Sequence, residues 1–415
     1  MRILLVGASG FIGAQLLRAL SAAGHSTIAT SRAGTGPALP GVEWRALDLL
    51  APQAFDWPDA ELLINATGLL STNPEPLWQL QAEASCALLR AAAERGMRLL
   101  QLSALGAGEQ PDVPFLASKA VADDCALGLG VPAQVLRPSL VLGAGGASSG
   151  WLQRLSPWPL VPLLNNRARL QPLHVDDLCG AVLALLRQWP AQNAVLPLVG
   201  PESLTQGQLL DRLRAAQGWA PARYLSLPGW LATPLGMLGE RLGWRALNRQ
   251  TLRLAARDNL ASAEPLAAAC GYRIAPLAAR LGDWPEASQS ISLALQPLLL
   301  ATLVLIWLGT ALVCLGPGFD WGLRILAEMG VDGGLARVAV IAGALLDGLL
   351  GVGLLLRRWR VHALRAQIAL MLGYTLLISL WLPHYWFDPY MAVGKNLVLM
   401  VASLWLLWLE KGRSR

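Results

Sequence analysis

The stretch of residues 291–315 contains no charged residue, and this feature limits the possible folds of the chain more than any other. An α-helix rises about 1.5 Å per residue, so the stretch can span the roughly 30 Å hydrocarbon core of a bilayer. Three later stretches carry at most two charges each, at residues 335–356, 363–382 and 393–409. The sequence therefore predicts four transmembrane helices within a membrane domain of residues 291–415.

Basic residues around these spans indicate which side of the membrane each loop occupies. Between the second and third spans and after the fourth, they are Arg357, Arg358, Arg360, Arg365, Lys411, Arg413 and Arg415. Cytoplasmic loops are enriched in Lys and Arg, so both places are predicted to face the cytoplasm. The first residues do not resemble a secretory signal, so we expect the N-terminal domain and the C-terminus on that same side. The expected location is the inner (cytoplasmic) membrane, with several passes.

The net charge of +6 is explained by this topology, and we take it as no sign of a nucleic-acid partner. The expected partner is the lipid bilayer. Five cysteines are separated along the chain, at Cys86, Cys125, Cys179, Cys270 and Cys314. Their spacing matches no metal-binding pattern, and we expect neither a metal site nor a disulfide framework.

A glycine-rich turn follows the apolar run of residues 3–6, which is typical of a buried parallel strand. Gly7 would let the chain turn, Gly10 would let the backbone approach a pyrophosphate, and Gly13 would allow close packing of the next helix. The helical period of residues 14–20 would then present free N–H groups and a positive dipole end to the anion. We interpret this strand–turn–helix as a dinucleotide-binding loop; the alternative is a structural turn without a nucleotide.

The second β-rich run, residues 26–31, ends in Ser31 and is followed by Arg32. A protein that prefers NAD usually places an acidic residue about 20 residues beyond the glycines, whereas an arginine suits the 2′-phosphate of NADP. Residues 26–40 contain no acidic residue. Arg32 with Ser31 therefore predicts NADP(H) in preference to NAD(H), and the alternative is an exposed surface arginine.

Strands and helices are predicted to alternate over residues 1–200. Further strands are expected at 42–46, 61–68, 98–103, 133–137 and 194–200, with helices at 76–95 and 114–129. This alternation predicts an α/β fold with a doubly wound parallel sheet of Rossmann type, whose ligand crevice lies at the C-terminal ends of the strands. Gly7, Arg32, Asp48, Gly68 and Ser103 all fall at such ends, and the acid Asp48 is placed to meet an adenine amino group.

Short motifs at residues 7–13, 65–68, 103–107, 118–120, 136–139 and 172–177 together resemble the short-chain dehydrogenase/reductase superfamily. Within it they are most similar to the atypical, extended branch that contains the nucleotide-binding accessory subunit of respiratory complex I. The resemblance covers about residues 1–285. It implies a bound NAD(P)(H) contacted by Gly7, Ser9, Gly10, Phe11, Ile12, Gly13, Ser31, Arg32, Asp48, Leu49, Ala66, Thr67, Gly68, Ser103, Lys119, Pro138 and Ser139.

The catalytic residues of the superfamily are incomplete in this chain. Active members pair a serine with Tyr-x-x-x-Lys, in which the phenol transfers the proton that accompanies hydride transfer. Ser103 and Lys119 stand at the serine and lysine positions, but Phe115 stands at the tyrosine position, so the usual carbonyl reduction lacks its proton donor. Ser118 or a water is a conceivable substitute. Ser103 and Lys119 are either nucleotide contacts that persist or a strand-end cap and a solvated helix residue.

Residues 201–285 are predicted to form the small helical substrate lobe that extended members add. The apolar segment 230–238 either lies in a membrane interface, where Trp230 suits the headgroup level, or packs in the core of the lobe. Residues 285–290 are predicted to be a short linker.

The four spans resemble the DoxX-like family through the glycine-rich segment 343–351 and the amphipathic loop 323–330 before it. Asp347 is the one acidic residue within a span, and Lys395 lies near the start of the fourth. Ionisable groups inside a membrane are costly and often functional. Asp347 could pair with Lys395, face a quinone headgroup, or cap a glycine-lined contact between helices.

Two functional hypotheses follow from these patterns. In the first, the chain is a membrane-bound oxidoreductase that passes hydride from NADPH to a membrane-soluble acceptor such as a quinone, using Ser103 and Lys119 without a tyrosine. In the second, it is a non-catalytic, nucleotide-bound module that stabilises a membrane protein partner or reports redox state to it.

Overall fold

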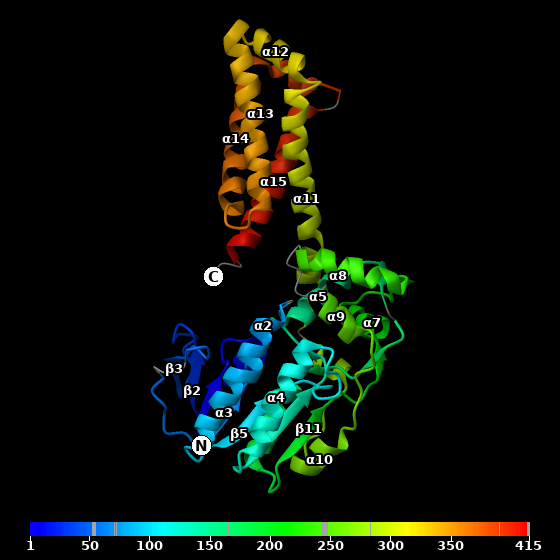
Figure 1. The fold of residues 1–415 in the computed structure, drawn as a ribbon. Coiled ribbons are helices and arrows are strands. Elements are labelled where there is room, and N and C mark those ends of the chain that lie inside the picture. Colours follow the sequence, from blue (N-terminus) through cyan, green and yellow to red (C-terminus); the bar gives the residue numbers. More distant parts are fainter. Residues whose placement is uncertain are drawn as a thin grey trace. The chain divides into compact units, whose positions relative to one another are not determined.

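The computed structural model describes residues 1–51, 55–69, 71, 73–164, 166–241, 248–282, 284–389 and 391–412. Arg413 and Arg415, which were counted among the basic residues after the fourth span, lie outside the described residues. The chain forms two compact units, Met1–Ile291 and Ser292–Arg415. Figure 1 shows the elements of each unit.

Unit 1 is built on a seven-stranded parallel sheet (Figure 1). In order across the sheet, the strands are β11 (Ala194–Leu198), β6 (Ala133–Pro138), β5 (Arg98–Leu102), β4 (Leu62–Asn65), β1 (Arg2–Val6), β2 (Ser26–Ser31) and β3 (Val42–Ala46). The predicted doubly wound parallel sheet is therefore confirmed.

The central strand β1 shows why the sheet needs helices on both faces. Ile3 and Leu5 pack with α1 (Phe11–Ala22) and α6 (Val175–Arg187) in one buried cluster. Leu4 and Val6 pack with α3 (Ser85–Ala93) and α4 (Pro114–Gly128) in another. Successive side chains of a strand point to opposite faces, so one uninterrupted apolar run fills both layers. Each such side chain contributes roughly 1.5–3 kcal/mol through burial.

The connection from β4 to β5 departs from a regular α-helix. The predicted helix at residues 76–95 is present, but it consists of α2 (Pro74–Leu77), a π-helical segment Trp78–Ala84 and α3. The Ser85 hydroxyl donates a hydrogen bond to the Leu80 carbonyl five residues earlier, at 3.0 Å. The wider turn brings Ser85 to within 3.3 Å of Thr67 at the end of β4, in keeping with the occurrence of π-turns near functional sites.

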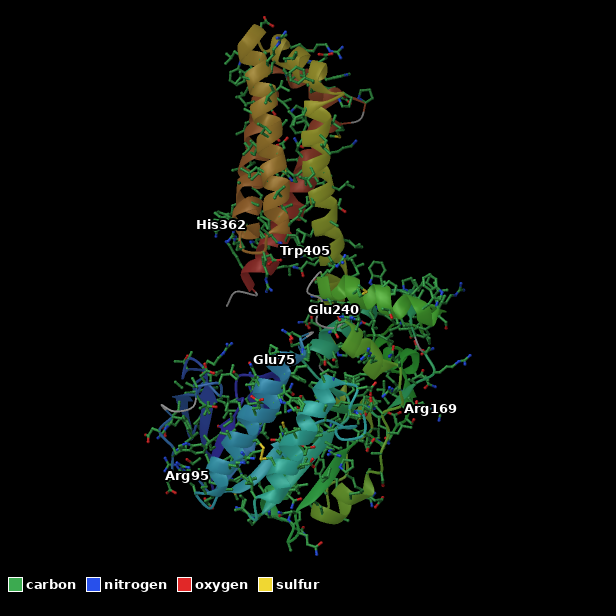
Figure 2. The ribbon with its side chains drawn as sticks, in the orientation of Figure 1. Glu75, Arg95, Arg169, Glu240, His362 and Trp405 are labelled. Carbon is green, nitrogen blue, oxygen red and sulfur yellow. A yellow bond between two sulfur atoms is a disulfide. The ribbon has the colours of Figure 1, made fainter. Side chains whose placement is uncertain are left out.

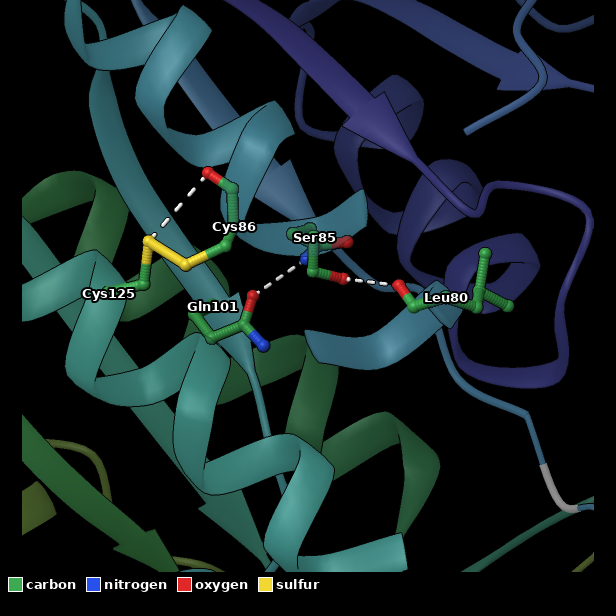
Figure 3. The surroundings of a disulfide bond; sticks show 6 residues. Leu80, Ser85, Cys86, Gln101 and Cys125 are labelled. Carbon is green, nitrogen blue, oxygen red and sulfur yellow. Dashed lines mark hydrogen bonds between the residues drawn. A yellow bond between two sulfur atoms is a disulfide. The ribbon is translucent and has the colours of Figure 1, made fainter. Parts of the chain in front are cut away.

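Cys86 on α3 and Cys125 on α4 form a disulfide, with 5.8 Å between their Cα atoms (Figure 3). The expectation that all five cysteines are isolated is therefore wrong for this pair. The two residues are 39 positions apart, and packing of α3 against α4 brings them together. Cys179, Cys270 and Cys314 are free thiols. If unit 1 faces the cytoplasm, the disulfide is open to reduction by the cellular thiol pool.

A smaller lobe covers one end of the sheet and draws on two separate parts of the chain. β8 (Leu160–Leu163) pairs in parallel with β13 (Arg223–Ser226). β9 (Arg169–Leu170) pairs antiparallel with β12 (Leu204–Thr205), and β7 (Val141–Leu142) pairs with β10 (Leu173–His174). The helices of the lobe are α5 (Ala147–Leu155), α7 (Gln206–Ala216), α8 (Ala232–Arg241) and α9 (Arg249–Ala255), whereas α10 (Glu264–Cys270) packs against α6 and β11 in the core of the main sheet.

Unit 2 contains the four expected spans. They are α11 (Ala287–Leu315), α13 (Gly333–Leu355), α14 (Arg360–Trp381) and α15 (Ala392–Gly412), all long and apolar enough to cross a membrane. The amphipathic loop expected before the second span is a helix, α12 (Phe319–Glu328). Because α11 begins at Ala287, the linker predicted at 285–290 is wrong for most of its length. The first turn of α11, up to Ile291, belongs to unit 1.

Asp347 lies in the interior of unit 2, where its side chain is 7% exposed. Its Oδ1 atom has no hydrogen-bond partner among the described residues. Lys395 is exposed and forms no ion pair with the described residues, so the pairing of Asp347 with Lys395 is not formed. Next to Asp347, Gly348 approaches Ala311, and Gly351 approaches Leu308 of α11. Asp347 therefore borders a glycine-lined contact between α13 and α11.

Candidate dinucleotide site

The edge where β1 and β4 end is the point at which the chain turns in opposite directions. From β1 the chain continues through α1 to β2 on one side, and from β4 it continues through α3 to β5 on the other. In open α/β sheets, ligands bind beside such a switch point, at the C-terminal ends of the strands. Gly7 follows β1 and Ala66 follows β4 at this edge, where the Ala66 amide donates to the Val6 carbonyl at 2.9 Å.

Three glycines shape the loop after β1, each for its own steric reason. Gly7 has φ +85°, and a Cβ atom there would lie 2.8 Å from the Ala66 carbonyl oxygen. The Gly10 amide donates to the Gly7 carbonyl at 3.0 Å, which closes the turn. A Cβ atom on Gly13 would lie 2.1 Å from the Gly7 carbonyl oxygen. Only glycine therefore lets α1 start this close to the strand.

The N-terminus of α1 is suited to an anion. Gly10 is the N-cap residue, it gives no side-chain cap, and the first turn contains no acidic residue. Ser9 and Gly10 are exposed, whereas Phe11 and Ile12 are half-buried. The first N–H groups of a helix have no partner within the helix, and the dipole favours negative charge beside them. These residues fit the pyrophosphate of a dinucleotide.

The predicted adenosine end of the site contains Arg32, which has no partner among the described residues, and two turns that are closed by hydrogen bonds of the Ser31 and Asp48 side chains. Arg32 is exposed and forms no hydrogen bond or ion pair with the described residues. The Ser31 hydroxyl donates to the Thr35 carbonyl at 3.0 Å and accepts from the Thr35 amide at 3.2 Å. Asp48 is exposed and accepts from the Leu50 amide at 3.0 Å, while Leu49 is buried. A guanidinium without a protein partner fits a 2′-phosphate.

The turn after β4 is fixed by a buried polar network. The Asn65 side-chain oxygen accepts from the Thr67 hydroxyl at 2.6 Å and from the Thr67 amide at 3.2 Å. The Asn65 amide donates to Gln101 at 2.8 Å. Gly68 is exposed, and a Cβ atom there would meet nothing within 4 Å. The turn is thus rigid on its inner side and open on its outer side, where a dinucleotide has room.

Lys119 ties the ends of two strands together. Its Nζ atom donates to the Thr67 carbonyl at 2.6 Å and to the Leu102 carbonyl at 2.9 Å. The residue is 5% exposed, so it is not a solvated helix residue. Burial lowers the pKa of Lys119 to about 8, and the nearby Asp123 carboxylate opposes this shift. Lys119 therefore links the C-terminal ends of β4 and β5 by hydrogen bonds to their carbonyl groups.

Asp123 is a buried site residue that the sequence pattern did not reveal. It accepts from the Ser103 hydroxyl at 2.7 Å and from the Arg137 guanidinium at 3.0 Å. Burial raises the pKa of Asp123, and the bonds from Ser103 and Arg137 oppose this rise. Asp123 lies four residues after Lys119, and this helical spacing was the signal that could have identified it. The Ser103 hydroxyl therefore donates its hydrogen bond to Asp123 in this structure.

Phe115 and Ser118 stand on the first turns of α4. Phe115 is half-buried and Ser118 is fully buried. The Ser118 hydroxyl donates to the Phe115 carbonyl at 3.1 Å. The Ser118 hydroxyl is thus buried and bonded within its own helix, which disfavours it as a substitute for the missing phenol. Ser103, at the end of β5, also carries a hydroxyl at this edge of the sheet.

The remaining predicted contacts, Pro138 and Ser139, end β6. Pro138 is buried, and the Ser139 hydroxyl donates to Asn259 of the lobe at 3.0 Å. The motif at residues 172–177 has a structural role: His174 caps α6 by accepting from the Asp176 amide at 3.3 Å. Among the described residues, no group of three or more His, Cys, Asp or Glu side chains could hold a metal ion.

The fold and the glycine loop define a dinucleotide-binding domain of Rossmann type. Residues 3–195 match the sequence profile of the NAD dependent epimerase/dehydratase family. Residues 304–404 match the profile of the DoxX-like family. The chain thus combines an N-terminal region similar to the NAD dependent epimerase/dehydratase family with a C-terminal region similar to the DoxX-like family, and its four long apolar helices suit a multi-pass membrane protein.

Two kinds of named relatives are similar to the N-terminal part of the chain. The ceramide reductase of Caulobacter vibrioides is 28% identical over 192 residues, which are 45% of this chain and 61% of the relative. Subunit 9 of the mitochondrial NADH dehydrogenase (ubiquinone) 1 alpha subcomplex is 27% identical in Dictyostelium discoideum, over 32% of this chain and 36% of the relative. The same subunit of Arabidopsis thaliana is 25% identical, over 54% of this chain and 59% of the relative. The chain thus spans less than two thirds of each relative.

Solved structures share the fold at low identity. A UDP-galactose 4-epimerase has a TM-score of 0.52 and 18% identity, covering 70% of this chain and 99% of its own. The human epimerase family protein SDR39U1 with NADPH has a TM-score of 0.51 and 19% identity, covering 71% and 98%.

The glycine loop gives a direct test of nucleotide binding. We expect Gly13→Ala to weaken binding of NADP(H) by roughly tenfold or more, since a Cβ 2.1 Å from the Gly7 carbonyl forces α1 off the strand. Gly128→Ala is the control, because a Cβ there meets no atom within 4 Å. Calorimetric titration of the purified protein measures both affinities, and equal affinities would contradict the assignment.

The buried amine of Lys119 predicts a pH dependence of stability. The folded chain releases this proton above about 8, whereas the unfolded chain keeps it up to the ordinary value of 10.5. Between these values the unfolded state binds more protons, so a rise in pH stabilises the fold at this site.

We expect the unfolding free energy of the wild type, relative to Lys119→Met, to increase by on the order of 3 kcal/mol from pH 8 to 10.5. Denaturant unfolding at a series of pH values measures this difference. A difference that stays constant or falls over this range would show that the buried amine is charged throughout.

Proposed function

We propose that the protein is a membrane-anchored NADP(H)-dependent oxidoreductase that passes hydride to a membrane-soluble acceptor such as a quinone. One observation carries the proposal: a sterically defined phosphate loop, with a free cation at its adenosine end, is followed in the same chain by four helices able to cross a membrane. A nucleotide site in a chain of this kind is best used on an acceptor that the membrane holds.

The preference for NADP(H) is supported by Arg32. Its exposed guanidinium follows the end of β2 and has no partner among the described residues, and residues 26–40 contain no acidic residue that could accept a hydrogen bond from a ribose hydroxyl. Arg32 would bind the 2′-phosphate, the N-terminus of α1 would bind the pyrophosphate, and Gly68 would leave room for the rest of the dinucleotide.

Replacing Arg32 tests this preference. We expect Arg32→Ala to weaken NADP(H) binding by roughly 10- to 100-fold, because charge-assisted hydrogen bonds contribute about 1.5–3 kcal/mol, and to leave NAD(H) binding nearly unchanged. The control is Arg18→Ala, which removes an exposed arginine bonded to Gln15 on α1. Mass analysis of the copurifying nucleotide supplies an independent check: NAD(H) in the wild type would contradict the preference.

Phe115 favours an acceptor that needs no phenolic proton donor. A bound NADPH would supply the hydride. Hydride addition to a ketone leaves an alkoxide, a strong base that requires an acid beside it. Hydride addition to a quinone leaves a phenolate-type anion, which is a much weaker base and can take its proton from water. The absence of the phenol at Phe115 is therefore less damaging for a quinone than for a ketone.

The names of the relatives are consistent with a lipophilic acceptor. One relative is named a ceramide reductase, and others are subunits of a ubiquinone-linked dehydrogenase. A lipid carbonyl would make a stronger demand than a quinone, because Ser103 would have to give its hydroxyl proton to the substrate oxygen and take a proton from Asp123, which would have to be in its protonated form and be reprotonated from solvent afterwards. Ser103 and Asp123 are 2.7 Å apart, which permits that transfer.

A second candidate function is a non-catalytic nucleotide-bound module for a membrane protein partner. Three observations favour it: Phe115 has no proton to give, Ser103 is bonded to Asp123, and Lys119 is bonded to two carbonyls. In this candidate the bound nucleotide stabilises the fold. The protein then reports to its membrane partner whether that nucleotide is oxidised or reduced, and it catalyses no hydride transfer.

Phe115→Tyr separates the two candidates. We expect the wild type in nanodiscs to oxidise NADPH with a quinone, and the variant to gain roughly 10²-fold in reduction of an aldehyde or ketone through the restored general acid. Absorbance of NADPH at its reduced-nicotinamide band follows both reactions. If the wild type fails to oxidise NADPH with every quinone, aldehyde and ketone that is tried, the oxidoreductase is excluded and the second candidate stands.

The orientation we propose places unit 1, the α13–α14 loop and the C-terminus in the cytoplasm, with the inner membrane as the location. The basic cluster before α14 supports it. Arg360 at the start of α14 forms an ion pair with Glu410 near the end of α15 at 3.0 Å, and Gln296 of α11 donates to the same carboxylate at 3.3 Å. The start of α14 and the end of α15 are thus joined by an ion pair, as expected of two helix ends on a single membrane face.

A further inference from the structure

We propose that one face of α8 and of the short 3-10 turn before it lies in the lipid headgroup layer of the leaflet that α11 enters. This face, called the apolar stripe, contains Trp230, Thr233, Pro234, Met237, Leu238 and Arg241. The proposal concerns attachment to the bilayer and does not depend on whether the nucleotide turns over.

The apolar stripe is exposed although most of its side chains are apolar. Trp230 is 73% exposed, Met237 is 43% exposed and Leu238 is 47% exposed. The members recur at intervals of three and four residues, which places them on one side of a helix. Core packing was one of two arrangements that the sequence allowed for this segment, and the exposure of these three side chains contradicts it.

The opposite side of α8 carries the small residues. Gly236 and Gly239 are buried. A Cβ atom on Gly236 would lie 2.8 Å from the Arg249 side chain, so glycine lets α9 pack closely. Glu240, labelled in Figure 2, forms an ion pair with Arg249 at 3.0 Å that holds the two helices together. Large apolar groups point outward and small ones inward, which is the reverse of a helix that faces water.

Two strands next to this segment repeat the pattern. In the β8–β13 pair, Pro162 is opposite Leu225 and Leu160 is opposite Arg223. Leu160 is 56% exposed and Leu225 is 52% exposed, whereas Val161 between the two outward positions of β8 is buried. The outward face of this pair is therefore apolar with one basic residue, and β13 leads directly through Pro228 into the 3-10 turn.

The first turn of α11 identifies the bilayer as the occupant. Gln153 of the lobe donates to Gln289 at 3.0 Å, and Ser290 is fully buried. The uncharged stretch begins at the next residue and continues to residue 315. The lobe is thus bonded to the residues that directly precede the uncharged stretch.

The composition of the stripe fits that layer. Tryptophan is enriched at the headgroup level, and a basic residue beside apolar ones suits lipid phosphates. Arg241 and Arg223 are exposed at the borders of the surface, and the stripe itself contains no acidic residue. A second copy of the chain that docked through the same surface would place these basic residues against one another, which is unfavourable.

Photocrosslinking of the full-length protein in nanodiscs of phosphatidylglycerol and phosphatidylethanolamine tests the proposal. A benzophenone amino acid replaces Met237 in one variant and Trp230 in another. The control replaces Val121, which is 37% exposed on α4 outside the lobe. Retained binding of NADP(H), or of whichever nucleotide copurifies, shows that each variant is folded.

We expect lipid adducts at positions 230 and 237 to be at least ten times as abundant as at position 121, with mass spectrometry as the readout. Lipid adducts at the level of the Val121 control would overturn the proposal. Adducts that join two protein chains at 230 or 237, in place of lipid adducts, would also overturn it and would assign the stripe to self-association.

Discussion

The close approach of the glycine loop to the turn after β4 is the constraint on which unit 1 depends. Gly7 lies so near Ala66 that a side chain would touch the neighbouring backbone, and Gly13 lies even nearer to the Gly7 carbonyl. Both contacts require that β1 and β4 be adjacent and end at the same level, which the register Val6 opposite Asn65 provides. The position of α1, and with it the direction of its N–H groups, follows from these contacts. A site for an anion therefore results from backbone packing, before any charged side chain takes part.

A second layer of the site is polar and buried, and it stands where the catalytic residues of the superfamily would be. Lys119, Ser103, Asp123 and Arg137 bond to one another or to strand ends. Burying such groups costs free energy unless each is paired, and here each of the four forms at least one hydrogen bond. The second carboxylate oxygen of Asp123, Oδ1, accepts no hydrogen bond from the described residues. The arrangement holds β4, β5 and β6 in register beneath the crevice, which explains why the lysine and serine persist in a chain that has a phenylalanine in place of the tyrosine.

The sequence predicted those features that depend on local pattern. Each strand of the main sheet, the glycine loop and the four spans have periodicities or uncharged runs that can be read without knowledge of the fold. What it missed depends on contacts between distant residues. The Cys86–Cys125 disulfide requires α3 to pack on α4. Asp123 of α4 becomes a site residue because Ser103 and Arg137 reach it from the ends of β5 and β6. The π-helical turn changes hydrogen bonding without changing composition. The direction in which α8 points was equally hidden, since an apolar segment reads the same whether it faces a core or a lipid.

The attachment of unit 1 to the membrane changes which acceptors it can use. A tethered site meets membrane-held partners at a far higher effective concentration than a free one, whereas a soluble substrate gains nothing from the tether. In this chain the tether is short, because the residues that α11 places in unit 1 directly precede the uncharged stretch. Both candidate functions use this property, one through an acceptor dissolved in the lipid and the other through a partner fixed in the same membrane. A dehydrogenase for soluble metabolites would have no physical reason to carry four spans.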